Sequence, residues 1–168
     1  MTNFPAPGPL TLENRRQHEA HEELRLDFLE ALIQLDLEGA RAAFRALEEA
    51  LTAHLELEEA RVLPALARAL DERGGEREVT DQHVEGDHKI LRRTFARCEA
   101  LLDRLAGEGE GQRRALVKEL DTFLLLGRVL EHHTAREDRL VYPLLDDALS
   151  EAERAALLER LRALPRLT

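Results

Sequence analysis

Two segments of the sequence place a histidine four residues before a glutamate, as His54 with Glu58 and His133 with Glu137. Residues four apart lie on one face of an α-helix, so each pair presents an imidazole and a carboxylate to the same point. Flanking leucines at compatible spacings indicate that both pairs face the interior, where unpaired carboxylates are very costly. Bound divalent or trivalent cations remove this cost, because each carboxylate can bridge two of them. The pairs therefore predict a buried site for iron, manganese or zinc.

Both pairs belong to an internal repeat. Each residue of the first pattern matches a residue of the second at one constant separation in sequence, as His54 matches His133. The first pattern comprises Phe44, Leu47, Leu51, His54, Glu58 and Val62, and the second comprises Phe123, Leu126, Leu130, His133, Glu137 and Val141. A further repeat matches His21, Leu24 and Phe28 with His88, Leu91 and Phe95. A single His–Glu pair is ordinarily a surface ion pair. Its duplication inside apolar patterns favours metal binding over a polar network held by hydrogen bonds alone.

Helical periodicity dominates the chain, and no segment alternates as a β-strand does. Four long helices are expected at 12–37, 40–70, 82–106 and 112–147, separated by Gly39 and the polar segments 71–81 and 107–111. The sequence SEAE at 150–153 has the form of a capping box and begins a short fifth helix ending near Pro165.

This pattern predicts an all-α fold, an antiparallel up-down-up-down four-helix bundle with a short C-terminal fifth helix. The expected organisation is an extended proline-rich N-terminal lead at 1–11, the bundle at 12–149, and the C-terminal helix at 150–168 packed on the bundle.

Composition argues against several classes of protein. The chain of 168 residues has 34 acidic and 24 basic residues, and its net charge of −10 argues against nucleic acid or an anionic membrane as a partner. No apolar run has the roughly 18 residues of a membrane span, and the N-terminus lacks a signal-peptide pattern, so a cytoplasmic location is expected. Cys98, the only cysteine, excludes an intrachain disulfide and is expected in the core.

Other metal-site patterns fit less well. A ferritin-like di-iron site needs two Glu-x-x-His segments, and only Glu85 with His88 supplies a convincing one. The zinc-protease motif His-Glu-x-x-His is absent, since the segment that begins at His21 has arginine at its fifth position.

Together these residues resemble the hemerythrin-like family of cation-binding domains, which is named HHE after its His-His-Glu pattern. The resemblance covers about residues 15 to 149 through His21, HLELEEARVLP at 54–64, His88, and HTAREDRLVYP at 133–143. It implies two iron ions inside a four-helix bundle, joined by an oxo or hydroxo bridge. By this resemblance Glu58 and Glu137 bridge the metals, and four histidines are terminal ligands: His21, His54, His88 and His133.

The sequence departs from the family pattern at one position. Oxygen-carrying hemerythrins use a fifth histidine four residues before the third-helix ligand, where this chain has Val84. His83 lies one residue from that position and is the first candidate for a fifth ligand, provided that the helix begins irregularly. His18, one turn before His21, is the second candidate.

Polar residues beside the expected ligands have a different expected role. His132 points about 100° away from His133 on a helix. It is expected at the surface or in contact with a ligand, and Glu59 and Asp138 are expected to be solvated or hydrogen-bonded to the ligands.

The number of ligands bears on function. Two octahedral metals offer about twelve coordination positions, of which two carboxylates, a bridging oxygen and four histidines would leave about two open. Open positions favour dioxygen, nitric oxide or peroxide, so a protein that binds dioxygen or a related small ligand for sensing, storage or delivery is expected. The alternatives are a metal-dependent redox enzyme acting on peroxide or nitric oxide, and a metal-responsive structural or sensor protein. The expected assembly is a monomer or homodimer.

Overall fold

The computed structural model describes residues 6–74 and 79–165, and within these ranges it contains helices and turns but no strands. The prediction of an all-α protein is therefore confirmed for this part of the chain. The helices are α1 (Pro9–Ile33), α2 (Leu37–Leu57), α3 (Leu63–Arg73), α4 (Asp81–Gly107), α5 (Gln112–Arg136), α6 (Tyr142–Ala148) and α7 (Glu151–Arg162). A π-helical turn joins α2 to α3 without a break, and another joins α5 to α6.

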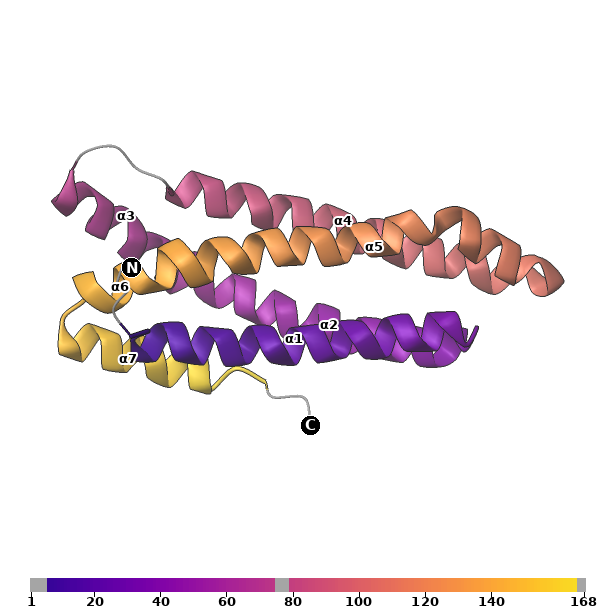
Figure 1. The fold of residues 1–168 in the computed structure, drawn as a ribbon, viewed down its shortest axis with the longest axis horizontal. Helices are drawn as coiled ribbons and strands as arrows, with labels where there is room; N and C mark the ends of the chain where they lie inside the picture. Colours follow the sequence, from indigo (N-terminus) through magenta and orange to yellow (C-terminus); the bar gives the residue numbers. More distant parts are fainter. Residues whose placement is uncertain (1–5, 75–78, 166–168) are drawn as a thin grey trace.

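The helices form a bundle of two hairpins (Figure 1). α1 packs beside α2, and α4 packs beside α5. α3 and α6 lie at the same end of the bundle, and α7 packs along α1 near this end. The bundle arrangement agrees with the prediction, and it brings segments from both sequence repeats to one interior.

The two π-helical turns occupy equivalent positions in the repeat. They cover Glu58–Val62 and Glu137–Val141. The first residue after each turn, Leu63 or Tyr142, donates its backbone N–H to the carbonyl oxygen of the glutamate five residues earlier. Pro64 and Pro143 follow, and a proline inside a helix lacks an N–H and crowds the carbonyl four residues before it. The wider turn accommodates this crowding, and single π turns inside α-helices are frequent at functional sites.

The N-terminus of α1 is fixed by a residue from α6. The backbone N–H groups of Leu10 and Thr11 donate to the Asp146 carboxylate at 3.0 Å each, and the Thr11 hydroxyl donates to it at 2.7 Å. Pro9 at the first turn suits a helix start, because its fixed φ is helical and its missing N–H would be unpaired. The helix thus begins before position 12, so residues 9–11 of the expected extended lead are helical. Residues 1–5 of that lead lie outside the described residues.

The first turn differs from the sequence-based expectation. The chain reverses at residues 34–36, and Asp36 accepts a hydrogen bond from the N–H of Gly39 at 2.9 Å. Gly39 therefore lies in the first turn of α2 and does not mark the reversal. A Cβ at this position would lie 2.2 Å from Asp36 Oδ2, so a larger residue would have to displace the capping carboxylate.

The other expected connections agree more closely. The capping box at the start of α7 is confirmed, with Ser150 accepting from the N–H of Glu153 and Glu153 accepting from the N–H of Ser150. The expected loop at 71–81 is shorter than predicted, because α3 continues to Arg73. Residues 75–78 of that loop lie outside the described residues.

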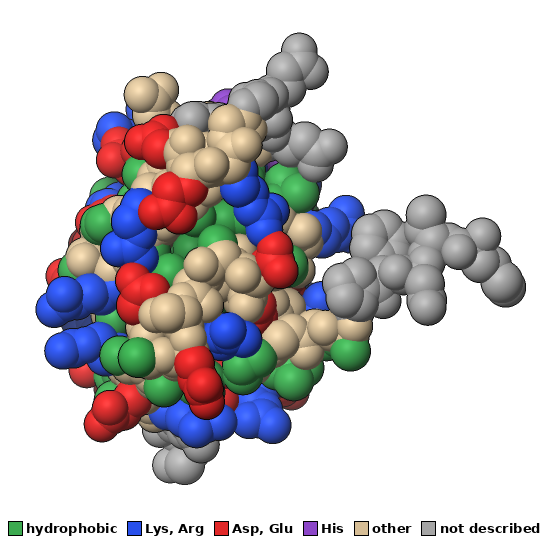
Figure 2. All heavy atoms as spheres, turned by 90° about the vertical axis from the view of Figure 1, so that its left-hand side faces the viewer, with side chains coloured by type: hydrophobic (Ala, Val, Ile, Leu, Met, Phe, Trp, Pro, Cys, Tyr) green, Lys and Arg blue, Asp and Glu red, His purple; other side chains and the backbone are tan. Residues whose placement is uncertain are grey.

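Figure 2 shows the end of the bundle where α3 and α6 lie. Basic and acidic side chains are interspersed on this face, with apolar side chains between them. Arg68 of α3 pairs with Glu153 of α7 at 2.5 Å, and Arg73 pairs with Asp147 of α6. Charges of both signs therefore connect the short helices across this face.

Two hydrophobic clusters fill the interior on either side of the π turns. The first contains one phenylalanine from each long helix, with ring centroids 5.2 to 5.5 Å apart between neighbours: Phe28, Phe44, Phe95 and Phe123. The second lies around α3 and α6 and includes Val62, Leu66, Val84, Val141, Leu145 and Leu161. Cys98 is buried in the first cluster, as predicted. The polar residues of the repeat lie in the segments between these clusters.

Candidate metal centre

Two glutamates lie at the centre of the polar region, and neither has any exposed surface. Glu58 and Glu137 each begin one of the π turns. His54 lies one turn before Glu58, with 3.3 Å between its Nε2 and the nearer carboxylate oxygen. His133 lies one turn before Glu137, with its Nε2 at 3.1 Å. Each imidazole also faces the carboxylate of the other repeat at 3.9 Å, so the two His–Glu pairs form one cluster.

His88 of α4 joins this cluster through one ring nitrogen and contacts a second carboxylate through the other. Its Nε2 lies 3.3 Å from Glu58 Oε2, and its Nδ1 lies 2.9 Å from Glu59 Oε1. Arg92 holds Glu59 from the outside at 2.7 Å. Metal-binding histidines commonly donate their outer N–H to a carboxylate, which fixes the ring and its tautomer. The contacts of His88 have this form.

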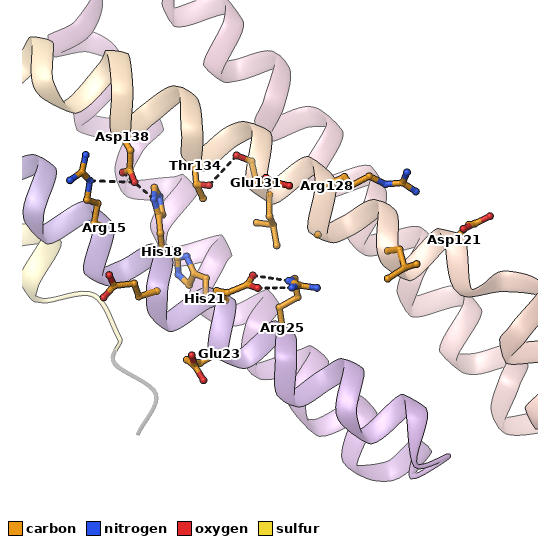
Figure 3. Close-up of a pocket in the computed structure, with 15 residues that line it drawn as sticks. Arg15, His18, His21, Glu23, Arg25, Asp121, Arg128, Glu131, Thr134 and Asp138 are labelled. Atoms are coloured by element: carbon orange, nitrogen blue, oxygen red, sulfur yellow. Dashed lines mark hydrogen bonds and ion pairs between the residues drawn. The ribbon is translucent and has the colours of Figure 1, made fainter. Parts of the chain in front are cut away.

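His18 of α1 has the same arrangement in the other half of the site. Its Nε2 lies 3.1 Å from Glu137 Oε2, and its Nδ1 lies 3.3 Å from Asp138 Oδ1. Arg15 lies 3.6 Å from Asp138 on the outer side (Figure 3). Glu59 and Asp138 are therefore both in contact with a buried histidine, in agreement with one of the two expectations for them.

His21 is placed close to the cluster but on its edge. It is buried, and its ring centroid lies 5.2 Å from that of His54 and 6.4 Å from that of His18. Its Nδ1 has no hydrogen-bond partner. Under the repeat, His21 corresponds to His88, yet it is His18 that makes the two carboxylate contacts equivalent to those of His88. The structure thus brings two histidines of α1 to a place where the sequence pattern predicted one.

The two candidates for a fifth histidine lie in different surroundings. His83 is exposed, and its Nδ1 accepts a hydrogen bond from the N–H of Thr80 at 3.2 Å, as part of the cap of α4. The helix begins regularly at Asp81, so the irregular start that His83 required does not occur. Val84, which stands where oxygen-carrying hemerythrins have their fifth histidine, is buried in the second hydrophobic cluster. His18 is the additional histidine that lies against the carboxylates.

His132 lies at the surface and outside the site, which is one of the two placements expected for it. It is exposed, and its Nε2 lies 2.9 Å from a guanidinium nitrogen of Arg136. Arg136 in turn pairs with Asp87 of α4. These contacts stabilise the packing of α5 on α4 without contacting the inner carboxylates.

Tyr142 was not predicted as part of the site. It is fully buried, and its hydroxyl donates a hydrogen bond to Glu58 Oε1 at 2.9 Å. The residue is the only tyrosine of the chain and occupies the position of Leu63 in the other repeat. The replacement of leucine by tyrosine at matching positions of the two repeats was the one signal available in the sequence. Each inner carboxylate thus has its own polar partner, Tyr142 for Glu58 and His18 for Glu137.

The charged groups of the cluster shift one another's pKa values. Burial alone would lower the pKa of His54, but the attraction of Glu58 and Glu137 raises it to about 10. Burial would raise the pKa of Glu58, yet the neighbouring His54 and His88 hold it well below its ordinary value. Burial, with the charges of His54 and His18, lowers the pKa of His21 to about 2. His54 is therefore one of the cations that compensate the carboxylates, since the pKa values of His18 and His88 are also raised by the nearby carboxylates, and His21 is neutral.

The donor set fits bound metal cations. Several buried atoms of the cluster have no hydrogen-bond partner, namely Nδ1 of His18 and His21, Nδ1 and Nε2 of His54 and His133, Nε2 of His88, Oε2 of Glu58 and Oε1 of Glu137. Buried polar groups are ordinarily satisfied, so this concentration needs an explanation. Among the described residues, two overlapping sets bring their ligand atoms within 4.8 Å of one another: Glu58, His88, His133 and Glu137; and His18, His54 and Glu137. Both sets include Glu137, and imidazole with carboxylate is a donor set for iron, manganese or zinc.

The fold and the site together define a helical-bundle protein with a buried His/Glu cation site. The family model for the hemerythrin HHE cation binding domain matches residues 79–165, just over half of the chain. The chain therefore belongs to the hemerythrin HHE cation-binding family. The matched range contains His88, His133 and Glu137, while His54 and Glu58 repeat the same pattern in the first half.

The remaining comparisons add no relatives. Neither the curated proteins nor the solved structures gave a significant match. Among the described residues, no helix is long and apolar enough to cross a membrane.

Proposed function

We propose that this protein is a non-haem di-iron protein that binds dioxygen or a related small ligand, such as nitric oxide or peroxide, for sensing, storage or delivery. One observation carries the proposal. Two fully buried carboxylates lie among five buried histidines, and unpartnered ring nitrogens of these histidines come from all four long helices. A cluster of this kind is costly without a cation.

The proposed ligands follow from the contacts of the cluster. Glu58 and Glu137 are proposed to bridge the two ions, because each faces histidines of both repeats. Terminal ligands would be His54, His88 and His133, together with His21 and His18 from α1. The proposal also includes the predicted up-down-up-down order of the helices within residues 12–149, which is supported by the two hairpins of Figure 1.

Two iron ions, when bound, would supply an open coordination position and the electrons for binding an oxidising ligand. The chain would supply everything else. Glu59 and Asp138 would fix the rings of His88 and His18 through their outer nitrogens. With five histidines, two bridging carboxylates and a bridging oxygen, about one of some twelve octahedral positions stays open. This favours a ligand of a few atoms over a larger substrate.

The test is an optical one. Protein loaded with ferrous iron under anaerobic conditions should show new absorption in the near-ultraviolet and visible range on exposure to air or nitric oxide. A Glu137→Ala variant treated identically should lack this change, whereas His132→Ala should retain it. An unchanged spectrum in the iron-loaded parent protein would refute the proposed ligand binding.

A further inference from the structure

A groove lies on the outside of the bundle between α1 and α5 and has a volume of about 840 Å³. The residues that line it include His18 and His21 from α1 and Thr134 from α5 (Figure 3), and also Leu130 from α5. The two histidines are only 8% and 4% exposed. Since His18 Nε2 lies 3.1 Å from Glu137, one layer of imidazole rings separates the groove from the inner carboxylates.

The groove is rich in charge, and its balance is acidic. Six of its fifteen lining residues are acidic and three are arginine. Two of the acidic residues pair with arginines on α1, Asp138 with Arg15 and Glu22 with Arg25. The other four are exposed on the two helices that form its walls: Glu19, Glu23, Asp121 and Glu131. A cleft with this balance concentrates cations and repels anions.

His21 supplies an observation that is independent of the acidic residues. It lines the groove, it is more than nine-tenths buried, and its Nδ1 has no hydrogen-bond partner. Its ring lies beside that of His54, which is part of the central cluster. A buried imidazole with an unpartnered nitrogen, at the inner end of an acidic groove, is suited to receive a cation from solvent.

We propose that this groove is the route by which divalent cations, ferrous iron first among them, enter and leave the centre. The four exposed carboxylates attract the ion to the groove, and His21 and His18 are the nitrogen ligands that line it. The inference rests on the proposed function, because it concerns how the ions of that centre arrive.

The experiment measures the rate of metal uptake. Metal-free protein is mixed with Co²⁺ at low ionic strength, and the cobalt absorption bands are followed by stopped flow. The parent protein is compared with a variant that carries Glu19→Gln, Glu23→Gln, Asp121→Asn and Glu131→Gln. We expect the association rate of this variant to fall by about tenfold or more, because electrostatic steering changes such rates by 10–10³. The number of ions bound at saturation should stay the same.

Salt and a matched control separate the groove from overall charge. The difference in rate should narrow near 1 M salt, where the Debye length is about 3 Å. A control with Glu49→Gln, Glu72→Gln, Glu110→Gln and Glu159→Gln changes the net charge equally at exposed positions outside the groove. Its rate should stay within about twofold of the parent, since only local charge steers the ion.

Two results would overturn the assignment of the groove: an unchanged rate in the groove variant, or equal slowing in the control. A parent protein that takes up no cobalt would contradict the proposed centre, and the entry route with it.

Discussion

His54 is the residue whose protonation most directly links this centre to pH. Burial alone would lower its pKa, but Glu58 and Glu137 raise the pKa from 6.5 to about 10. A raised pKa in the folded state stabilises the metal-free protein fully below about pH 6.5, and this stabilisation is lost as the pH rises through about 10. Metal binding has the opposite dependence, because a histidine must lose its proton to coordinate an ion.

Metal binding at pH 7 is therefore expected to release at least about one proton per centre, from His54. Titration calorimetry with Zn²⁺, in buffers of different ionisation enthalpy, measures this number. The apparent affinity should increase with pH and level off above about pH 10. His132→Ala should release as many protons as the parent protein, because this residue is exposed and outside the cluster. Binding without proton release would contradict the place of His54 in the centre.

The sequence was informative about the residues that the repeat duplicates. His54, Glu58, His133 and Glu137 interrupt two apolar patterns in the same register, and the structure brings all four together. Residues outside the repeat could not be found in this way. His18 has no counterpart histidine in α4, so its contacts with Glu137 and Asp138 depend on how α1 packs against α5.

At the scale of the elements, the position of α1 relative to α6 decides where His18 and His21 lie. Asp146 caps α1 through the N–H groups of Leu10 and Thr11, although it lies more than 130 positions away in sequence. The first repeat has Ala67 at the equivalent position. This contact from α6 to α1 therefore has no equivalent at the matching position of the first repeat. The helix that it caps, α1, is the one that carries both His18 and His21.

Replacing Asp146 by alanine should lower the free energy of unfolding by about 1–2 kcal/mol, the cost of losing a helix cap. Urea denaturation of metal-free protein measures the change. Asp147→Ala is the matched control: its carboxylate is exposed and pairs with Arg73, so the expected change is below about 0.5 kcal/mol. Equal losses in the two variants would show that the cap contributes nothing specific.

Element boundaries were the weaker part of the sequence prediction, and the reasons are local. Gly39 suggested the first turn, but it lies within α2, where its N–H donates to the capping Asp36 carboxylate. His83 was considered as a ligand, yet its ring caps α4 through Thr80. In both cases a side chain bonds to a nearby backbone N–H, and such bonds leave no periodic signal. The π turns likewise depend on local contacts, because each begins at a buried glutamate and is followed by a proline.

At the scale of the whole molecule, the internal repeat made the bundle predictable. Each repeat contributes one long helix with a His–Glu pair and one with a histidine. The repeat also places a phenylalanine on every long helix, and these four rings pack together at one side of the site. What the repeat does not determine is its own asymmetry: Tyr142 replaces Leu63, and the charged groove opens on one side between α1 and α5.

The central claim is that Glu58 and Glu137 together hold two metal ions, and counting those ions tests it most directly. Protein saturated with ferrous iron under anaerobic conditions is passed through a desalting column, and bound iron is measured by native mass spectrometry. The account predicts two ions per chain in the parent protein, His83→Ala and His132→Ala, and fewer than two in Glu58→Ala and Glu137→Ala. Two ions per chain in either glutamate variant, or fewer than two in the parent, would contradict it.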